Sequence, residues 1–372
     1  MNTKLVHQPN RFVSGKGHLP GPSIEIDVSD SIRGENWITN HSDSADSSTW
    51  GILDAENGSA QFLVARSQNL IGNGVTRIED ANLDSLGVIV NRSAGVDSAQ
   101  FAESHLEITT LGATMLRYEN LPDGMTVLGD GTNVYSFADP TDRYPHGALG
   151  DRIEWGSLVA GPVDPVREVD RFILSESEVF EGLFPLLGDI DGDGFTEIVT
   201  TVSESNGGAR LVAFSYENSK LEIIAESDPV GTGFRWLHQI AVAPFGPNGE
   251  TEIAVVETPH VGGIAKFYRL IGDRLELVAS EAGGYMSHLN GSRNLDQAVA
   301  GDFDGDGSVE LVVPSRDQET LIALRREGET IEEVWELELG SRLTSNLSVF
   351  TTDDGSLTLG AATEDGVLHI WQ

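Results

Sequence analysis

The sequence contains no cysteine among its 372 residues. Disulfide bonds, thiolate nucleophiles and cysteine-ligated metals are therefore excluded, and cysteine usage says nothing about the redox compartment. Basic residues are also scarce, because 23 Lys and Arg stand against 59 Asp and Glu, which gives a formal net charge of −36. Such a chain repels nucleic acid and anionic membrane surfaces, so neither is expected as a partner.

Long apolar runs are missing as well. No segment reaches the length of a transmembrane helix, and residues 1–22 are polar and carry no signal-peptide pattern. Helical periodicity is absent. What the chain does contain is 39% hydrophobic residues in short runs, punctuated by 42 glycines and 14 prolines. This pattern predicts many short strands joined by turns.

The chain repeats itself in its second half. Segments that begin at Leu186, Val242 and Val299 align, with one residue fewer in the second, so that three glutamates become equivalent: Glu197, Glu252 and Glu310. In each unit one apolar run precedes this glutamate and three follow it, over about fifty residues. Four strands per repeat at a period of about 40–50 residues are typical of a β-propeller blade.

We therefore predict an all-β fold, a seven-bladed β-propeller of four-stranded antiparallel blades, with six or eight blades as the alternatives. Residues 61–372 are expected to form a single propeller domain, in which the repeats are clear over 183–372 and degenerate over 70–182. Residues 1–60 are expected to form an N-terminal extension, part of which closes the last blade.

The C-terminal unit, residues 347–371, supplies only three strands. An open sheet edge promotes aggregation, so an N-terminal strand is expected to complete this blade. The candidate is Gln61–Ala65.

Two acidic loops carry the spacing of a calcium site. Calcium prefers six to eight oxygen ligands from carboxylates and backbone carbonyls, and alternate Asp side chains in a tight Gly-containing loop converge on one point. The predicted ligands of the first loop are Asp189, Asp191, Asp193, the carbonyl of Phe195, and Glu197. Those of the second are Asp302, Asp304, Asp306, the carbonyl of Ser308, and Glu310. The alternative is a metal-free hairpin turn, which three mutually repelling carboxylates disfavour.

Two further loops resemble these only in part. In the repeat over residues 236–280, Pro244, Gly246 and Asn248 replace the three aspartates, and no metal is predicted there. The segment Asp80-x-Asn82-x-Asp84 keeps the spacing but lacks the final glutamate, so whether it binds metal stays open.

The acidic loops resemble the FG-GAP/VCBS repeats of integrin alpha-like propellers and of bacterial calcium-binding proteins. The resemblance is good over residues 183–372 and weak over 70–182. It implies that each loop joins the first two strands of a blade, that two calcium ions have a structural role, and that the protein is periplasmic or extracellular. In that case the signal peptide is not part of this chain.

A second group of residues is predicted on the opposite face of the propeller. Loops on a rigid scaffold often carry function, and here the second-to-third and fourth-to-first connections hold most of the unusual side chains. The candidate ligand-binding residues are Arg143, His146, Arg235, His238, His260, His288 and Arg293. The alternative is that these residues brace neighbouring blades.

Three functions remain open from the sequence. The first is a monomeric binding module for a carbohydrate, another anionic ligand or a protein. The second is an enzyme such as a polysaccharide lyase, with His238, His288 or Tyr285 as base and Arg235 or Arg293 as a carboxylate clamp. The third is a metal site of clustered histidines. No P-loop or dinucleotide motif is present, and whether the protein is an enzyme is left undecided.

Overall fold

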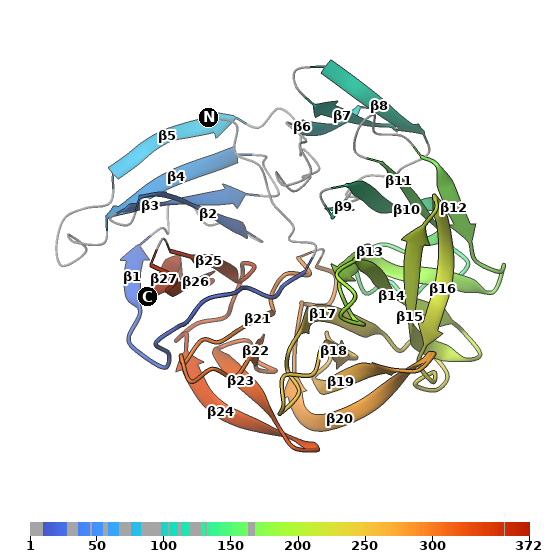
Figure 1. Cartoon of the computed structure of the whole chain (residues 1–372). Coiled ribbons are helices and arrows are strands. Elements are labelled where there is room, and N and C mark those ends of the chain that lie inside the picture. Colours follow the sequence, from blue (N-terminus) through green and yellow to red (C-terminus); the bar gives the residue numbers. More distant parts are fainter. Residues whose placement is uncertain are drawn as a thin grey trace.

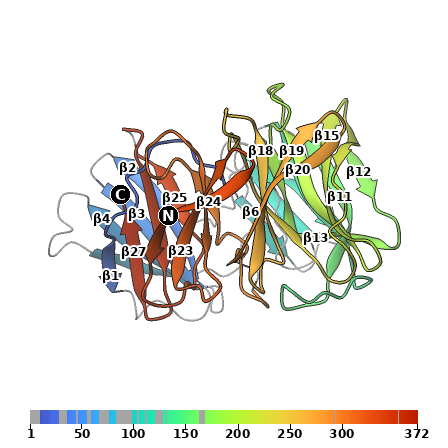
Figure 2. The same ribbon diagram turned by 90° about the horizontal axis from the view of Figure 1, so that it is seen from below.

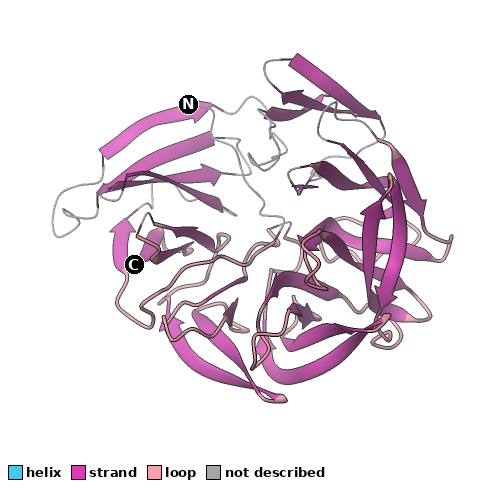
Figure 3. Cartoon of the chain, viewed as in Figure 1, coloured by secondary structure: helices cyan, strands magenta, loops and turns pink. Residues whose placement is uncertain are grey.

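The structure is a computed structural model of the whole chain. It describes residues 10–27 and 130–372 with their side chains, apart from gaps at 131, 163–167, 293 and 353 and the side chains of 26 and 350. Over residues 36–129 it describes only the backbone of the strands. The described residues form strands and no helix (Figure 3), and so include no helix able to cross a membrane.

The strands form up-and-down antiparallel groups arranged around a common centre (Figure 1). Seen from the side, they run between the two faces of the ring (Figure 2). Two sheets come from the first third of the chain. The first sheet contains β2 (Asn36–Ser44), β3 (Ser47–Asp54), β4 (Ser59–Arg66) and β5 (Thr76–Asn82). The second contains β6 (Ser98–Ala102), β7 (His105–Thr110) and β8 (Ala113–Glu119).

Three groups of four strands follow. They are β9 (Leu128–Gly129), β10 (Asn133–Thr141), β11 (Glu154–Pro162) and β12 (Asp170–Ile173); β13 (Glu178–Gly188), β14 (Glu197–Glu204), β15 (Gly208–Glu217) and β16 (Lys220–Glu226); and β17 (Leu237–Ala243), β18 (Glu252–Glu257), β19 (Gly263–Ile271) and β20 (Arg274–Tyr285). Single residue pairings, Trp155 with Phe180 and Glu226 with Arg274, connect them into one 12-stranded sheet.

Two more sheets complete the chain. One contains β21 (Val299–Gly301), β22 (Glu310–Pro314), β23 (Thr320–Glu327) and β24 (Thr330–Glu338); the other contains β25 (Ser348–Thr351), β26 (Leu357–Ala362), β27 (Val367–Trp371) and β1 (Ile24–Asp27). The predicted all-β architecture of antiparallel strand groups is confirmed.

The hydrophobic core lies between neighbouring sheets. Successive side chains of a strand point to opposite faces, and in β18 Ile253 and Val255 pack toward the β13–β16 group whereas Ala254 and Val256 pack toward the β21–β24 sheet. A strand buried on both faces needs an unbroken apolar run. This requirement explains why the apolar runs that follow Glu197, Glu252 and Glu310 do not alternate with polar residues.

The last sheet is closed by β1, which pairs antiparallel with β27 from Ile24 opposite Ile370 to Asp27 opposite Val367. Closure by an N-terminal strand is therefore confirmed, but the candidate Gln61–Ala65 is wrong. That segment lies in β4, whose backbone pairs with β3 and β5. The predicted boundary at residue 60 accordingly falls inside β4, and β2 and β3 belong to the same sheet as β4.

Residues 10–19, the N-terminal arm, cross the inner strands before reaching β1 (dark blue in Figure 1). Asn10 bonds the backbone of Val242 at the end of β17, Val13 N donates to Ala300 O in β21 at 2.9 Å, and Lys16 pairs with the β25–β26 turn. The guanidinium of Arg11 is buried and donates to the carbonyls of Asp296, Ala298 and Leu347. The arm thus connects three successive sheets from inside the ring.

Candidate functional site

Both acidic loops connect the first and second strands of a sheet. The first joins β13 to β14 and the second joins β21 to β22, and Glu197 and Glu310 are the first residues of β14 and β22. Each loop contains two glycines with positive φ, 80° and 89° in the first loop and 78° and 98° in the second. These left-handed conformations fold the loop back on itself and favour glycine.

The two loops share one hydrogen-bond scheme. Gly194 N donates to Asp189 Oδ2 at 3.0 Å and Gly307 N to Asp302 Oδ2 at 3.1 Å. The third aspartate of each loop, Asp193 or Asp306, donates its backbone N–H to the second aspartate at 3.0 Å and accepts a hydrogen bond at 2.8 Å from the residue two positions later. This agreement follows from the Asp-x-Asp-Gly-Asp-Gly-x-x-Glu pattern that both loops contain. The first loop has one further bond, from Gly192 N to Asp189 Oδ1 at 2.7 Å.

The closing glutamates bond back to the start of their loops. Ile190 N donates to Glu197 Oε2 and Phe303 N to Glu310 Oε2, both at 2.8 Å. Each glutamate is thereby fixed by one oxygen, and its second oxygen remains available to a ligand.

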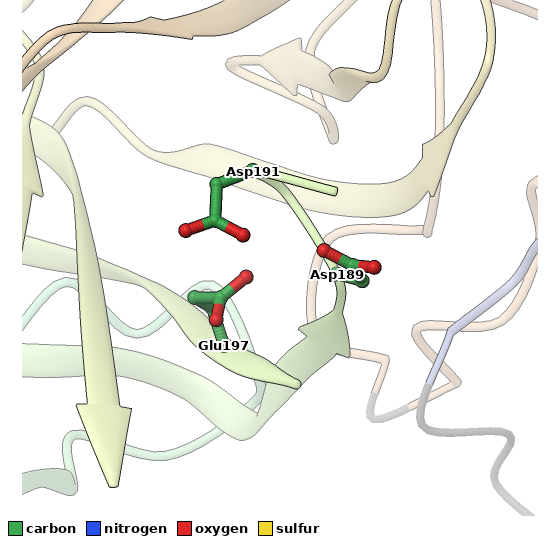
Figure 4. Close-up of side chains that lie close together, drawn as sticks. All are labelled: Asp189, Asp191 and Glu197. Atoms are coloured by element: carbon green, nitrogen blue, oxygen red, sulfur yellow. The ribbon is translucent and has the colours of Figure 1, made fainter. Parts of the chain in front are cut away.

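Carboxylate oxygens of each loop also converge. One oxygen each of Asp189, Asp191 and Glu197 lie within 4.8 Å of one another, and the same holds for Asp302, Asp304 and Asp306. Figure 4 shows the carboxylates of the first set gathered around one small space. Hard cations such as calcium prefer this all-oxygen donor set. The carbonyl oxygens of Phe195 and Ser308 carry no described interaction.

Burial of the closing glutamates disfavours their charged form when no cation is bound. Glu310 is fully buried, and burial together with Asp304, Asp306 and Asp302 raises its pKa to about 8; the same causes raise the pKa of Glu197 to about 7. In the second loop, Asp302 Oδ1 and Glu310 Oε1 are buried with no hydrogen-bond partner. A divalent cation would satisfy both oxygens and offset the repulsion.

The equivalent loop between β17 and β18, which lacks the three aspartates, balances the charge of its glutamate with arginines. Glu252 is the first residue of β18, equivalent to Glu197 and Glu310, and it is fully buried. Arg269 donates to its Oε1 at 2.5 Å and Arg326 to its Oε2 at 2.9 Å. Two guanidinium groups, from β19 and β23, thus balance the charge of the retained glutamate, so it needs no metal.

The cationic partners of these loops were not predicted from the sequence, although strand pairing locates them. Arg325 stands opposite Glu310 in the register of β22 and β23, and Arg269 is opposite Glu252 by the same register. The Arg325 guanidinium lies 2.6 Å from Asp306 and 3.7 Å from Asp304. In the first loop the register brings Ser215 to this position, so only the second acidic loop has an arginine at its rim.

Four predicted residues come together on the face opposite these loops. His146 lies in the β10–β11 loop, His238 at the start of β17, His260 in the β18–β19 loop and His288 between β20 and β21. Ring centres are 5.3 Å apart for His146 and His260, 5.3 Å for His260 and His288, and 5.7 Å for His238 and His288. We call these four residues the histidine cluster.

The histidine cluster is largely buried. His238 and His288 are inaccessible, whereas His146 and His260 reach the surface in part. Burial lowers the pKa of His238 and of His260 to about 4 and that of His288 well below its usual value. These three imidazoles are neutral at pH 7, so among the predicted ligand-binding residues they supply no positive charge for an anionic ligand.

Hydrogen bonds orient two of the four rings. His146 Nδ1 contacts the buried carboxylate of Glu181, which also accepts from Ser203, and His238 Nδ1 lies 2.6 Å from Ser287 Oγ. By contrast, both ring nitrogens of His288 and Nδ1 of His260 are buried without a partner, as is Nε1 of the adjacent Trp236. Glu181 was not predicted as a member of this site, because it lies 35 residues from His146 along the chain.

The predicted arginines do not share these contacts. Arg143 donates to the backbone carbonyl of Glu178 at 2.7 Å, and Arg235 is half exposed with Glu257 3.6 Å away. Arg293 and Asp84 lie outside the described residues. Asp80 and Asn82 fall within the pairing register of β5 rather than in a loop, and their side chains are not described.

The proposed lyase bases are inaccessible to a polymer. Tyr285, like His238 and His288, is buried, and its hydroxyl donates to Glu333 Oε1 at 2.7 Å. The described geometry therefore gives this enzymatic alternative no support.

A ring of antiparallel strand groups with strands running between its faces defines the β-propeller class. No family model matches the sequence, and no curated protein matches it. A solved structure described as BBS1N in complex with ARL6DN, from a crystal soaked with mercury, is similar with a TM-score of 0.52 at 12% identity, over 94% of this chain and 97% of that one. A lead-soaked crystal of the same complex gives 0.49 at 13% identity, with the same coverage. The first comparison supports a β-propeller fold and says nothing about ligands of this chain.

Proposed function

We propose that the protein is a calcium-stabilised β-propeller that serves as an interaction module. The observation that carries the calcium assignment is the convergence of carboxylate oxygens in both loops. In the second loop, two buried oxygens, Asp302 Oδ1 and Glu310 Oε1, also have no hydrogen-bond partner. The grouping of strands around one centre supports a count of seven blades.

The experiment is a calcium titration of metal-free protein by calorimetry, with native mass spectrometry to count ions. The parent is expected to bind two calcium ions, and Asp191→Ala and Asp304→Ala one each. Asn248→Ala is the matched control, because Asn248 occupies the third-aspartate position of the arginine-balanced loop, and it should leave both ions. A folded parent that binds no calcium would contradict the proposal.

We further propose that the face opposite the acidic loops binds a carbohydrate or another anionic ligand. Exposed residues of the connecting loops support this placement: Phe234 and Arg235 precede β17, and Val261 and Arg316 lie in second-to-third connections. Aromatic and arginine side chains dominate the energetics of many binding surfaces, and an arginine offers a planar fork of donors to a carboxylate.

A screen of acidic glycans tests this face. Arg235→Ala should lose ligands that the parent binds, whereas Arg274→Ala, an exposed arginine at the β19–β20 turn, should keep them. Equal binding by the parent and Arg235→Ala would count against the proposed face. We also propose that the protein is an exported monomer. Calcium reaches millimolar concentrations outside cells, which suits loops of modest calcium affinity. Recovery of the full-length gene product in the cytosolic fraction would contradict export.

A further inference from the structure

We propose that His146, His260 and His288 bind a zinc-like divalent transition metal on the face opposite the acidic loops. This site is independent of the calcium loops, since it uses nitrogen ligands from different connections. Imidazole nitrogen suits zinc, copper and nickel, whereas calcium requires oxygen.

Two of the three ring pairs have the spacing of metal-bound imidazoles. A zinc–nitrogen bond of about 2.0 Å places the ring centre about 3.2 Å from the metal, so two ligands at a tetrahedral angle have centres about 5.2 Å apart. The observed distances are 5.3 Å for His146 and His260 and 5.3 Å for His260 and His288. Packed aromatic pairs also span about 4.5–7 Å, and His146 lies 5.1 Å from Phe234. The spacing therefore allows a shared ion, and the choice between packing and metal binding rests on the ring nitrogens.

Unpartnered nitrogens are the second, independent observation. His288 is fully buried, and neither of its ring nitrogens has a hydrogen-bond partner. A buried imidazole without any partner costs free energy, and a metal ion would remove that cost. His260 Nδ1 is in the same situation.

The contact of His146 with Glu181 supplies the outer support that metal-binding histidines commonly have. A ligating imidazole usually donates its other N–H to a carboxylate or carbonyl, which fixes the ring. Here Nδ1 of His146 faces the buried carboxylate of Glu181, and Nε2 is left as the ligand atom. His238 is fixed by Ser287 and lies beside His288 as a further neighbour.

Metal binding requires a change in ring orientation. Among the described residues, the sets of three ligand atoms within 4.8 Å of one another are the two acidic ones, so the imidazole nitrogens do not yet converge. Rotation about χ2 exchanges the positions of nitrogen and carbon while leaving the ring centre nearly in place. No hydrogen bond opposes this rotation at His288, and none holds Nδ1 of His260.

The metal would connect parts of the ring that are distant in sequence. His146 belongs to the β9–β12 group and His260 to the β17–β20 group, and the two groups are separated by β13–β16. A bound ion is therefore expected to raise the melting temperature, because it binds the folded chain and not the dispersed ligands of the unfolded one.

The test is a titration of tag-free protein with zinc chloride in excess calcium, so that the acidic loops are filled. Calorimetry should show one zinc per chain, and cobalt at the same site should give the visible absorption of a tetrahedral complex. His260→Gln and His288→Gln should each abolish both signals, and the exposed His18→Gln should change neither.

Folding of each variant is checked by its circular dichroism and calcium binding. Because His260 is only partly buried, His260→Gln is the variant that keeps the test valid if His288→Gln fails to fold. The proposal is overturned if the folded parent binds no zinc or if His260→Gln binds it as the parent does. It is equally overturned if the zinc signal disappears in Asp191→Ala rather than in the histidine variants.

Discussion

Replacing Glu310 with glutamine should have opposite effects on stability with and without calcium. In the metal-free protein the buried Glu310 carboxylate has one oxygen without a partner and lies among three aspartates. With a pKa of about 8, the Glu310 carboxyl must take up a proton when the metal-free chain folds at pH 7, which costs free energy. Glutamine has nearly the same shape, keeps an oxygen for Phe303 N, needs no proton, and places an amide N–H beside the aspartate acceptors. Relief of one buried unsatisfied group is worth about 1–3 kcal/mol, so metal-free Glu310→Gln should be more stable than the parent by about that amount.

Calcium should invert this order. An ion that binds only the folded state adds about 2.7 kcal/mol at a concentration one hundred times its dissociation constant. The parent receives this stabilisation at the second loop, whereas Glu310→Gln has lost a charged ligand and receives little of it. Urea unfolding followed by tryptophan fluorescence, in EDTA and in excess calcium, measures both orders.

Glu252→Gln is the matched control for this experiment. Glu252 occupies the same strand position but is bonded to Arg269 and Arg326, so its substitution leaves buried positive charge uncompensated. Loss of one partner of a buried ion pair typically costs about 3–5 kcal/mol, and here the loss should not depend on calcium at this loop. The reasoning is refuted if Glu310→Gln is destabilising in EDTA, or if calcium stabilises it as much as the parent.

Two further substitutions probe the charge balance and the closure of the ring. Arg325→Gln should increase the calcium affinity of the second loop by about fivefold. The partly exposed arginine competes with calcium for Asp306, and its ion pair contributes about 1 kcal/mol at most. Calorimetry in the Asp191→Ala background, in which only this loop binds calcium, measures the change, and an unchanged or weaker affinity would contradict the prediction. Arg11→Ala should lower the free energy of unfolding by about 1.5–3 kcal/mol, because it removes a buried guanidinium that donates hydrogen bonds to three carbonyls. Lys16→Ala, at an exposed position of the same arm, is the control. Equal unfolding midpoints for the two variants would count against this role of the arm.

Much of the architecture follows from sequence alone because it is locally encoded. The fifty-residue repeat, the apolar runs and the Asp-x-Asp-x-Asp-Gly spacing each depend on neighbours along the chain, and turn geometry converts that spacing into a converging carboxylate set. The equivalence of Glu197, Glu252 and Glu310 held for the same reason: each begins the second strand of its sheet.

Only the tertiary structure decided which segments far apart in the sequence pair or pack with one another. The choice of Ile24–Asp27 over Gln61–Ala65 as closing strand depends on which segment reaches the free edge of β27, and both have apolar positions suited to a strand. Arg269, Arg325 and Arg326 became partners of the loops through strand register and packing between sheets. The histidine cluster was expected to share one face, but its burial and the neutrality of three of its rings arise from loops of different sheets that close over it. The sequence pattern carries no information on desolvation by distant segments, so the sequence predicted the group of histidines on one face but not the burial that lowers their pKa values.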